Sequence, residues 1–221
     1  MAKHKQGRQS FLFPEPPVIT AWASIAGKKE SEGPLAHTFD ITSKDTYFGQ
    51  KSWELAEKRM QQLALETLAK KAGISLNEFD LVFSGDLLNQ CIGSSFTLRN
   101  RRIPHLGLYG ACSTMAESLL LASMTVSGGF ADKVAAMTSS HFASSERQYR
   151  FPLGYGGQRT PTAQWTVTVP VPLWYAPRAK ALRSLQQPSA WSQIWVLRMP
   201  TTWALPWHLP LLAPSAPILM T

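Results

Sequence analysis

A cysteine lies in a turn between an expected strand and an expected apolar helix. The turn is Gly110-Ala111-Cys112-Ser113-Thr114, and the helix that it opens covers residues 113–127. Free backbone N–H groups and the helix dipole at such a place favour the thiolate. Cys112 is therefore the best nucleophile candidate, with Ser113 beside it as a polar neighbour. From the spacing alone, the alternative is that Cys112 is only a small apolar side chain buried in a tight turn.

A nucleophile also needs a base, and His141 is the candidate. It ends the string Thr138-Ser139-Ser140-His141, directly after an expected strand at residues 133–138. From there the imidazole can face the same cleft as Cys112. The sequence displays no partner that would orient the ring, so the histidine alone does not establish catalysis.

Further polar residues follow the expected strand at residues 80–84. The string Ser84-Gly85-Asp86-Leu87-Leu88-Asn89-Gln90 begins at its carboxyl end, the edge where open α/β sheets bind ligands. Asp86 and Asn89 can reach a cleft at that edge. Asp86 can equally cap the next helix, and the sequence leaves both roles open.

One basic cluster lies near these motifs, at Arg147, Arg150 and Arg159. The planar guanidinium group suits a dicarboxylate, so Arg147 joins the ligand-binding candidates, with a solvated surface as the alternative. The sequence has no zinc-ligand spacing, P-loop, G-x-G-x-x-G or G-x-S-x-G, and we expect no cofactor or metal.

The net charge of +8 raises the question of nucleic acid, but its distribution argues against it. The last acidic residue is Glu146, and half of the net charge belongs to four basic residues after Arg159. Basic and aromatic residues do not interleave on a defined surface, so we expect no nucleic-acid partner. Two cysteines, no apolar segment after the basic start and no run of about 18 apolar residues favour an intracellular protein that is not secreted.

Strands and helices alternate along the chain after a short basic arm at residues 1–17. The expected strands are 18–24, 80–84, 105–109 and 133–138, and the expected helices are 53–71, 92–100 and 113–127. Gly73 is the expected C-cap of the first helix, and Ser75 with Glu78 forms a capping box after it. This order predicts βαβ units, an α/β class and a mostly parallel sheet over residues 18–168.

The composition changes after Thr168. Nine of the sixteen prolines and five of the eight tryptophans follow it, without a single Asp, Glu or Gly. No period of 2 or 3.6 runs through this segment, so we expect residues 169–221 to lack a stable fold. A proline-rich linker does not explain this segment either, because such linkers contain much less Trp and Leu.

The genetic code offers an explanation for this tail. When each codon is read from the third base of the present one, residues 169–174 permit Gly-Ala-Gly-Ala-Ala-Val. The same offset over residues 195–208 permits Leu-Gly-Val-Thr-Asp-Ala-Asn-Asn-Met-Gly-Ser-Ala-Met-Ala. One offset thus turns two odd stretches into ordinary sequence, as expected if a single base was lost near Thr168.

Several strings between residues 11 and 168 resemble the stage V sporulation protein AD family in order and spacing. They are Gly33-Pro34-Leu35 with His37 and Phe39-Asp40, Gly85 to Gln90, Gly110 to Thr114, Thr138 to His141, Glu146-Arg147-Gln148, and Tyr155 to Gln158. The shifted string with Met-Gly-Ser-Ala-Met-Ala resembles the family's next segment.

The resemblance implies the N-terminal half of a thiolase-like αβαβα fold. It also implies a spore protein that binds dipicolinic acid, free or as its calcium chelate, and helps to load it into the forespore. The family is associated with the spore inner membrane and with other stage V sporulation proteins of the same operon, and a homodimer is compatible with it.

The family is not known to be enzymatic, although thiolases and ketoacyl synthases carry acyl groups on the cysteine at the position of Cys112. An acyltransferase using Cys112 is therefore the alternative. In those enzymes the partner residues come largely from the second half, and a missing half leaves apolar surface uncovered. We therefore expect a truncated chain that folds poorly or is inactive.

Overall fold

A mixed sheet forms the centre of the protein. The computed structural model describes residues 4–7, 10–149, 162, 165–177, 192–193, 196–198 and 219–220, with side chains up to residue 145, at 162 and over 165–177. Within these residues, six strands lie in the order β10-β3-β9-β8-β6-β7. Their bounds are β3 Val18–Trp22, β6 Leu81–Gly85, β7 His105–Gly107, β8 Val134–Ser140, β9 Val169–Ala176 and β10 Ser192–Gln193.

The sheet is mixed, but β3, β6, β7 and β8 run in one direction and only β9 and β10 in the other, which confirms the expected mostly parallel sheet. Strand β6 pairs in parallel with both β7 and β8. Strand β9 is antiparallel to β8 and to β3, so β3 runs in the same direction as β8. The strands β3, β6, β7 and β8 therefore end at one edge of the sheet.

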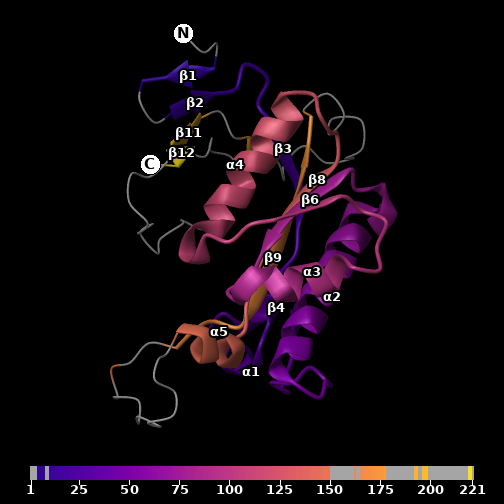
Figure 1. Cartoon of the computed structure of the whole chain (residues 1–221), viewed down its shortest axis with the longest axis vertical. Coiled ribbons are helices and arrows are strands. Elements are labelled where there is room, and N and C mark those ends of the chain that lie inside the picture. The colour runs from indigo at the N-terminus through magenta and orange to yellow at the C-terminus, as the bar shows by residue number, and fades with distance from the viewer. Residues whose placement is uncertain are drawn as a thin grey trace.

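Helices cover the two faces of this sheet (Figure 1). The helices α2 (Trp53–Ala72) and α3 (Ile92–Leu98) lie on one face, where Leu65 and Leu68 share a core with Val82. Helix α4 (Thr114–Ser127) lies on the other, where Leu119 and Ala122 pack with Phe83. Alternate residues of the sheet thus face opposite cores, as the two-residue period of a strand requires.

Local signals set the ends of the helices. The Ser52 side chain accepts a hydrogen bond from Leu55 N at the start of α2, and Gly73 ends it in the left-handed conformation at φ 67°. The Ser75 and Glu78 capping box is present and opens the short 3-10 helix Leu76–Glu78. The predicted caps are confirmed.

Shorter elements complete the chain. They are α1 (Lys28–Ser31), α5 (Phe142–Tyr149), the parallel pair β4 (Ile25–Ala26) and β5 (Ile41–Thr42), and the 3-10 helices at Ala36–Thr38, Asn89–Cys91 and Ala111–Ser113. A second sheet holds β1 (Lys5–Gln6), β2 (Ser10–Leu12), β11 (Val196–Arg198) and β12 (Leu219–Met220). The expected basic arm therefore contains an antiparallel strand pair and a buried Phe13. Among the described residues, no helix is long and apolar enough to cross a membrane.

Strand β9 corrects the expected boundary at Thr168. We expected residues from 169 onward to lack a stable fold, but Val169–Ala176 lies between β3 and β8, and Trp174 is buried there. The alternation of backbone directions explains how two prolines are tolerated. Thr168 O accepts from Gly27 N at 2.9 Å and Pro172 O from Ala23 N at 3.1 Å, so even-numbered residues turn away from β8.

The consequence is that Pro170 and Pro172 remove no donor from the ladder with β8. An apolar run of adequate length, with its prolines in compatible register, therefore becomes a strand despite its unusual composition. Most of the tail after residue 177 lies outside the described residues.

Candidate functional site

The predicted site residues gather at one edge of the sheet. Strands β6, β7 and β8 are parallel neighbours, and each is followed within a few residues by a candidate: Asp86, Cys112 and His141 respectively. Because parallel strands end together, this is the edge at which open α/β sheets bind ligands. The structure places the three residues there but gives each a different local setting.

Cys112 is exposed, whereas Cys91 is buried. Cys112 lies in the 3-10 helix directly before α4, and its neighbour Ala111 has the left-handed φ of 48°. Such a conformation is unfavourable for a residue with a Cβ, so the turn holds the backbone in a strained shape that presents the thiol. The buried structural role fits Cys91, whose Sγ donates to Leu108 O at 3.0 Å.

The polar neighbours of Cys112 are held by local hydrogen bonds. Ser113 Oγ donates to Gly110 O at 2.8 Å, within the turn itself. Tyr109 Oη donates to Asn89 Oδ1 at 3.3 Å, which brings the predicted Asn89 next to the strand that leads to Cys112. Both Asn89 and Tyr109 are exposed, so a ligand can reach them.

Asp86 is buried, and its carboxylate is occupied. It accepts from Leu88 N at 3.0 Å, and from Ser94 N and Ser94 Oγ at 2.7 Å each. These bonds tie the end of β6 to the first turn of α3, which is the capping role that the sequence left open. Asp86 therefore positions the edge, and the hydrogen bonds described for its carboxylate do not involve Cys112.

His141 is fully buried, and both ring nitrogens are used. Nε2 donates to Thr46 O at 2.9 Å, and Nδ1 accepts from Ala143 N at 3.3 Å. Burial lowers the pKa of the imidazole, in keeping with a neutral ring that donates from Nε2. Within the described residues no hydrogen bond joins His141 to Cys112, so the expected base does not face the thiol in this arrangement.

Arg147 belongs to α5, which follows His141, but its side chain lies outside the described residues. Arg150 and Arg159 lie outside them entirely. The arginine cluster therefore stays a prediction.

The sequence interpretation missed a buried polar cluster beneath this edge, formed by Glu57, Gln61, Ser94, Ser139 and Ser144. Glu57 accepts from Ser139 Oγ at 2.9 Å and from Ser144 Oγ at 2.6 Å. Gln61 Nε2 donates to Ser139 Oγ at 2.6 Å. The cluster links α2 to the carboxyl end of β8 and to the start of α5.

Burial, assisted by the nearby charge of Asp86, raises the pKa of Glu57 to about 7, against the opposing hydrogen bonds from Ser144 and Ser139. A signal for this cluster was present in the sequence. Two polar residues spaced four apart, Glu57 and Gln61, interrupt the stripe that contains the buried Ala56 and Met60.

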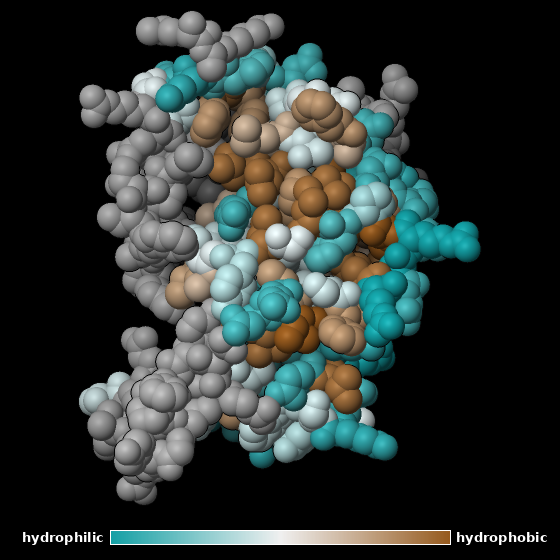
Figure 2. Space-filling view, in the orientation of Figure 1, coloured by the Kyte–Doolittle hydropathy of each residue, from teal (hydrophilic) through white to brown (hydrophobic). Residues whose placement is uncertain are grey.

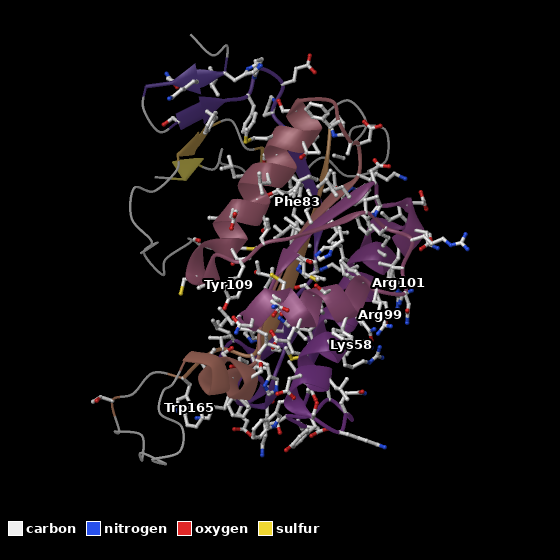
Figure 3. The ribbon with its side chains drawn as sticks, viewed as in Figure 1. Lys58, Phe83, Arg99, Arg101, Tyr109 and Trp165 are labelled. Atoms are coloured by element: carbon white, nitrogen blue, oxygen red, sulfur yellow. The ribbon has the colours of Figure 1, made fainter. Side chains whose placement is uncertain are left out.

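A cavity of about 350 Å³ opens at the same edge, beyond β8. It is enclosed by α1, by His141 and Phe142, and by the segment at residues 165–168 that leads into β9, with Lys28, Lys29 and Trp165 in its wall. Trp165 lies beside α5 (Figure 3). We call this the Lys28–Trp165 cavity. His141 is the only predicted site residue among those described in its lining.

Comparison with known proteins gives one clear family match. The family model described as stage V sporulation protein AD matches residues 7–173. The stage V sporulation protein AD of Bacillus subtilis (strain 168) is 42% identical over 162 residues, which are 73% of this chain and 48% of that protein. The chain thus spans about half the length of the curated relative that it matches.

Two solved structures are similar to this chain. The 3-oxoacyl-[acyl-carrier-protein] synthase III of Aquifex aeolicus VF5 is 12% identical with a TM-score of 0.50, over 72% of this chain and 53% of that chain. A variant of OleA from Xanthomonas campestris is 13% identical with a TM-score of 0.48, over 78% and 59% of the two chains. The first match supports the expected thiolase-like half fold.

Proposed function

Because the chain belongs to the stage V sporulation protein AD family, we propose that it is built to bind dipicolinic acid, free or as its calcium chelate, and that the family uses this binding to load the compound into the forespore. The family match over residues 7–173 carries the proposal. The polar carboxyl edge of the sheet supports it, since this is where such a fold receives a ligand.

Binding, rather than acyl transfer, is the chemistry that the site supports best. Cys112 is presented by a strained turn, as an acyl carrier would be, but the nearby His141 has both nitrogens engaged in backbone hydrogen bonds. A base held in this way cannot take the thiol proton without breaking its own contacts. We therefore propose that the protein is not an enzyme. The alternative is an acyltransferase that uses Cys112.

The remaining roles follow from the family resemblance. We propose action together with other stage V sporulation proteins of the same operon, at the face of the forespore or spore inner membrane. The resemblance also allows a homodimer.

We also propose that residues after Thr168 derive from a shifted reading frame. Their composition supports this, because nine prolines and five tryptophans occur there without a single Asp, Glu or Gly. The loading activity of the whole family protein is then not expected of this chain, whereas ligand binding by residues 7–173 can be tested directly.

Titration calorimetry with dipicolinate tests the proposal, on this chain and on the product of the gene with one base restored near the codon for Thr168. Saturable binding by the restored protein is the expected result, and an absence of binding by both proteins would contradict the proposed ligand. Incubation with an acyl-coenzyme A separates the alternative. A mass gain that disappears in Cys112→Ala would identify an acyltransferase.

A further inference from the structure

The fully buried side chain of Glu57 joins α2 to β8 and to α5. Its two carboxyl oxygens accept from Ser139 Oγ, near the end of β8, and from Ser144 Oγ, in the first turn of α5. The rings of Trp53 and Phe142, 6.5 Å apart between centroids, add an apolar contact between α2 and α5. Helix α5, at the lower end of the ribbon in Figure 1, has only eight residues. A helix of this length is not stable alone, so its position depends on such contacts.

The hydrogen bonds around Glu57 are complete when its carboxyl group carries a proton. Ser144 Oγ has a second acceptor, His141 O at 3.1 Å, so it can donate to this carbonyl and accept a proton from Glu57. Ser139 Oγ then donates to the other carboxyl oxygen and accepts from Gln61 Nε2. Each hydroxyl group donates once and accepts once. The protonated acid therefore closes the network without a buried charge.

An ionised Glu57 lacks a compensating charge. The salt bridges formed within the described residues do not include it, and the two charges that act on it, Asp86 and Glu54, are both negative. Burial, with these two charges, outweighs the hydrogen bonds from the serines and raises the pKa of Glu57 to about 7. A buried carboxylate without a cation is costly, so the packed arrangement favours the protonated form.

The elements packed against α2 supply no cation to this position within the described side chains. The strands β3, β4, β8 and β9 and the helix α3 contain no Asp, Glu, Lys, Arg or His. Tyr175 of β9 packs in the core on the α4 face. Glu78, in the 3-10 helix after α2, is paired with Lys133. On α5 the charged residues are Glu146 and Arg147, whose side chains lie outside the described residues.

We propose that Glu57 is a proton-dependent switch, which holds α5 against α2 while it is protonated and releases α5 when it ionises. Release of α5 lets water reach the carboxylate, so its pKa returns toward the ordinary value of 4.5. The contribution of Glu57 to docking is therefore complete below about pH 4.5 and is lost as the pH rises through about 7. Because α5 directly follows His141, its release opens the edge of the sheet beside this residue.

Hydrogen exchange followed by mass spectrometry on the full 221-residue chain tests the switch, with rates corrected for the intrinsic pH dependence of amide exchange. Between pH 5.5 and pH 7.5, the protection of residues 142–149 should fall at least about fivefold more than that of α4. In Glu57→Gln, which keeps the shape and cannot ionise, this difference should vanish. Ser144→Ala should lower the protection of α5 already at pH 5.5, because it removes the bond from α5 to Glu57.

The matched control is Glu66→Gln, on the same helix. The Glu66 side chain is 42% exposed and forms salt bridges with Arg59 and Arg101, so it removes a carboxylate from α2 without touching the buried network. This variant should keep the wild-type pH dependence of α5. A loss of that dependence in Glu66→Gln would overturn the assignment to Glu57.

Infrared spectroscopy gives a readout that does not depend on exchange. The wild-type chain at pH 6 should show the C=O band of a buried, protonated carboxylic acid, which should disappear by pH 8.5 and be absent from Glu57→Gln. Absence of this band from the wild type would overturn the proposal. So would equal changes of protection in α4 and α5 of the wild type, since Glu57 would then act on the whole fold and not on the docking of α5.

Discussion

At the scale of single residues, the most consequential group is one that the sequence did not single out. Glu57 is fully buried among serine hydroxyl groups and has a pKa of about 7, raised from 4.5 mainly by burial. A carboxylic acid with a raised pKa stabilises the fold while it is protonated. This contribution is complete below about pH 4.5 and is lost as the pH rises through about 7.

The first prediction follows from the direction of this pH dependence. The free energy of unfolding should fall by about 3 kcal/mol between pH 4.5 and pH 8 because of Glu57, the amount that such a pKa difference carries. In Glu57→Gln, which keeps the shape and cannot ionise, that part of the pH dependence should vanish. Urea unfolding at several pH values measures it. An unchanged slope in the variant would show that another group titrates.

A second prediction concerns the two thiols. Cys112 is exposed and Cys91 is buried with its Sγ bonded to a carbonyl oxygen, and burial raises the pKa of Cys91. A thiol reagent such as DTNB should therefore modify one cysteine rapidly in the native chain and the second only after unfolding. The rapid phase should disappear in Cys112→Ala and persist in Cys91→Ala. Two rapid phases in the native wild-type chain would contradict the structure.

At the scale of elements, the pairing of β9 with β8 depends on which backbone N–H groups of β9 point toward β8. Pro172 turns toward the β3 side, whereas the register Ala136↔Leu173 places the next residue on the ladder with β8. A third prediction is therefore that Leu173→Pro destabilises the fold by about 2–3 kcal/mol, since a buried carbonyl on β8 loses its donor. Pro172→Ala, which touches no bond to β8, should change the stability by less than about 1 kcal/mol. Thermal unfolding compares the two, and equal losses would argue against this register.

The elements also show where the sequence was informative. The caps at Gly73 and at Ser75 with Glu78 are local patterns, so they predicted the ends of α2 and the next turn correctly. The strands before Asp86 and His141 were recognisable as short buried runs. Strand β9 was missed because its prolines argue against a central strand, and only the pairing with β3 and β8 decides their orientation.

The candidate site was predicted in position but not in detail. The common edge for Asp86, Cys112 and His141 follows from the strand order alone. The hydrogen-bond partners of these residues do not follow from the strand order. His141 bonds to Thr46, 95 residues away, and the bond of Asp86 to Ser94 depends on how the intervening loop folds. The Lys28–Trp165 cavity likewise needs three distant segments, so no local pattern could reveal it.

At the scale of the whole molecule, apolar side chains gather on the visible face over α4 and the neighbouring strands (Figure 2). On α4 itself, Leu120 and Leu121 are only partly buried, and Phe130, which follows this helix, is 86% exposed. Such a surface binds dyes and promotes association. In the family fold we expect a second half to cover it.

The fourth prediction compares this chain with the product of the gene restored by one base near Thr168. The restored protein should be longer, bind less of the hydrophobic dye ANS per molecule and unfold at a higher temperature, because the face over α4 becomes buried. Sequencing of the gene provides the direct check. If no long frame continues at the proposed offset, the shifted-frame explanation is wrong.

The position of β9 also bears on how the chain folds as it is made. Thr20 on β3 and Trp174 on β9 are hydrogen-bonded partners 154 residues apart, and within the described sheet β3 pairs only with β9 and the later β10. At translation rates of about 5–20 residues per second, β3 leaves the ribosome and waits on the order of ten seconds or more for its partner. The apolar residues of β3 are exposed during that interval. A base lost near Thr168 would change the sequence of β9, the strand with which β3 pairs. Until β9 emerges, β3 is thus an unpaired apolar strand in the nascent chain, and an exposed strand of this kind favours aggregation.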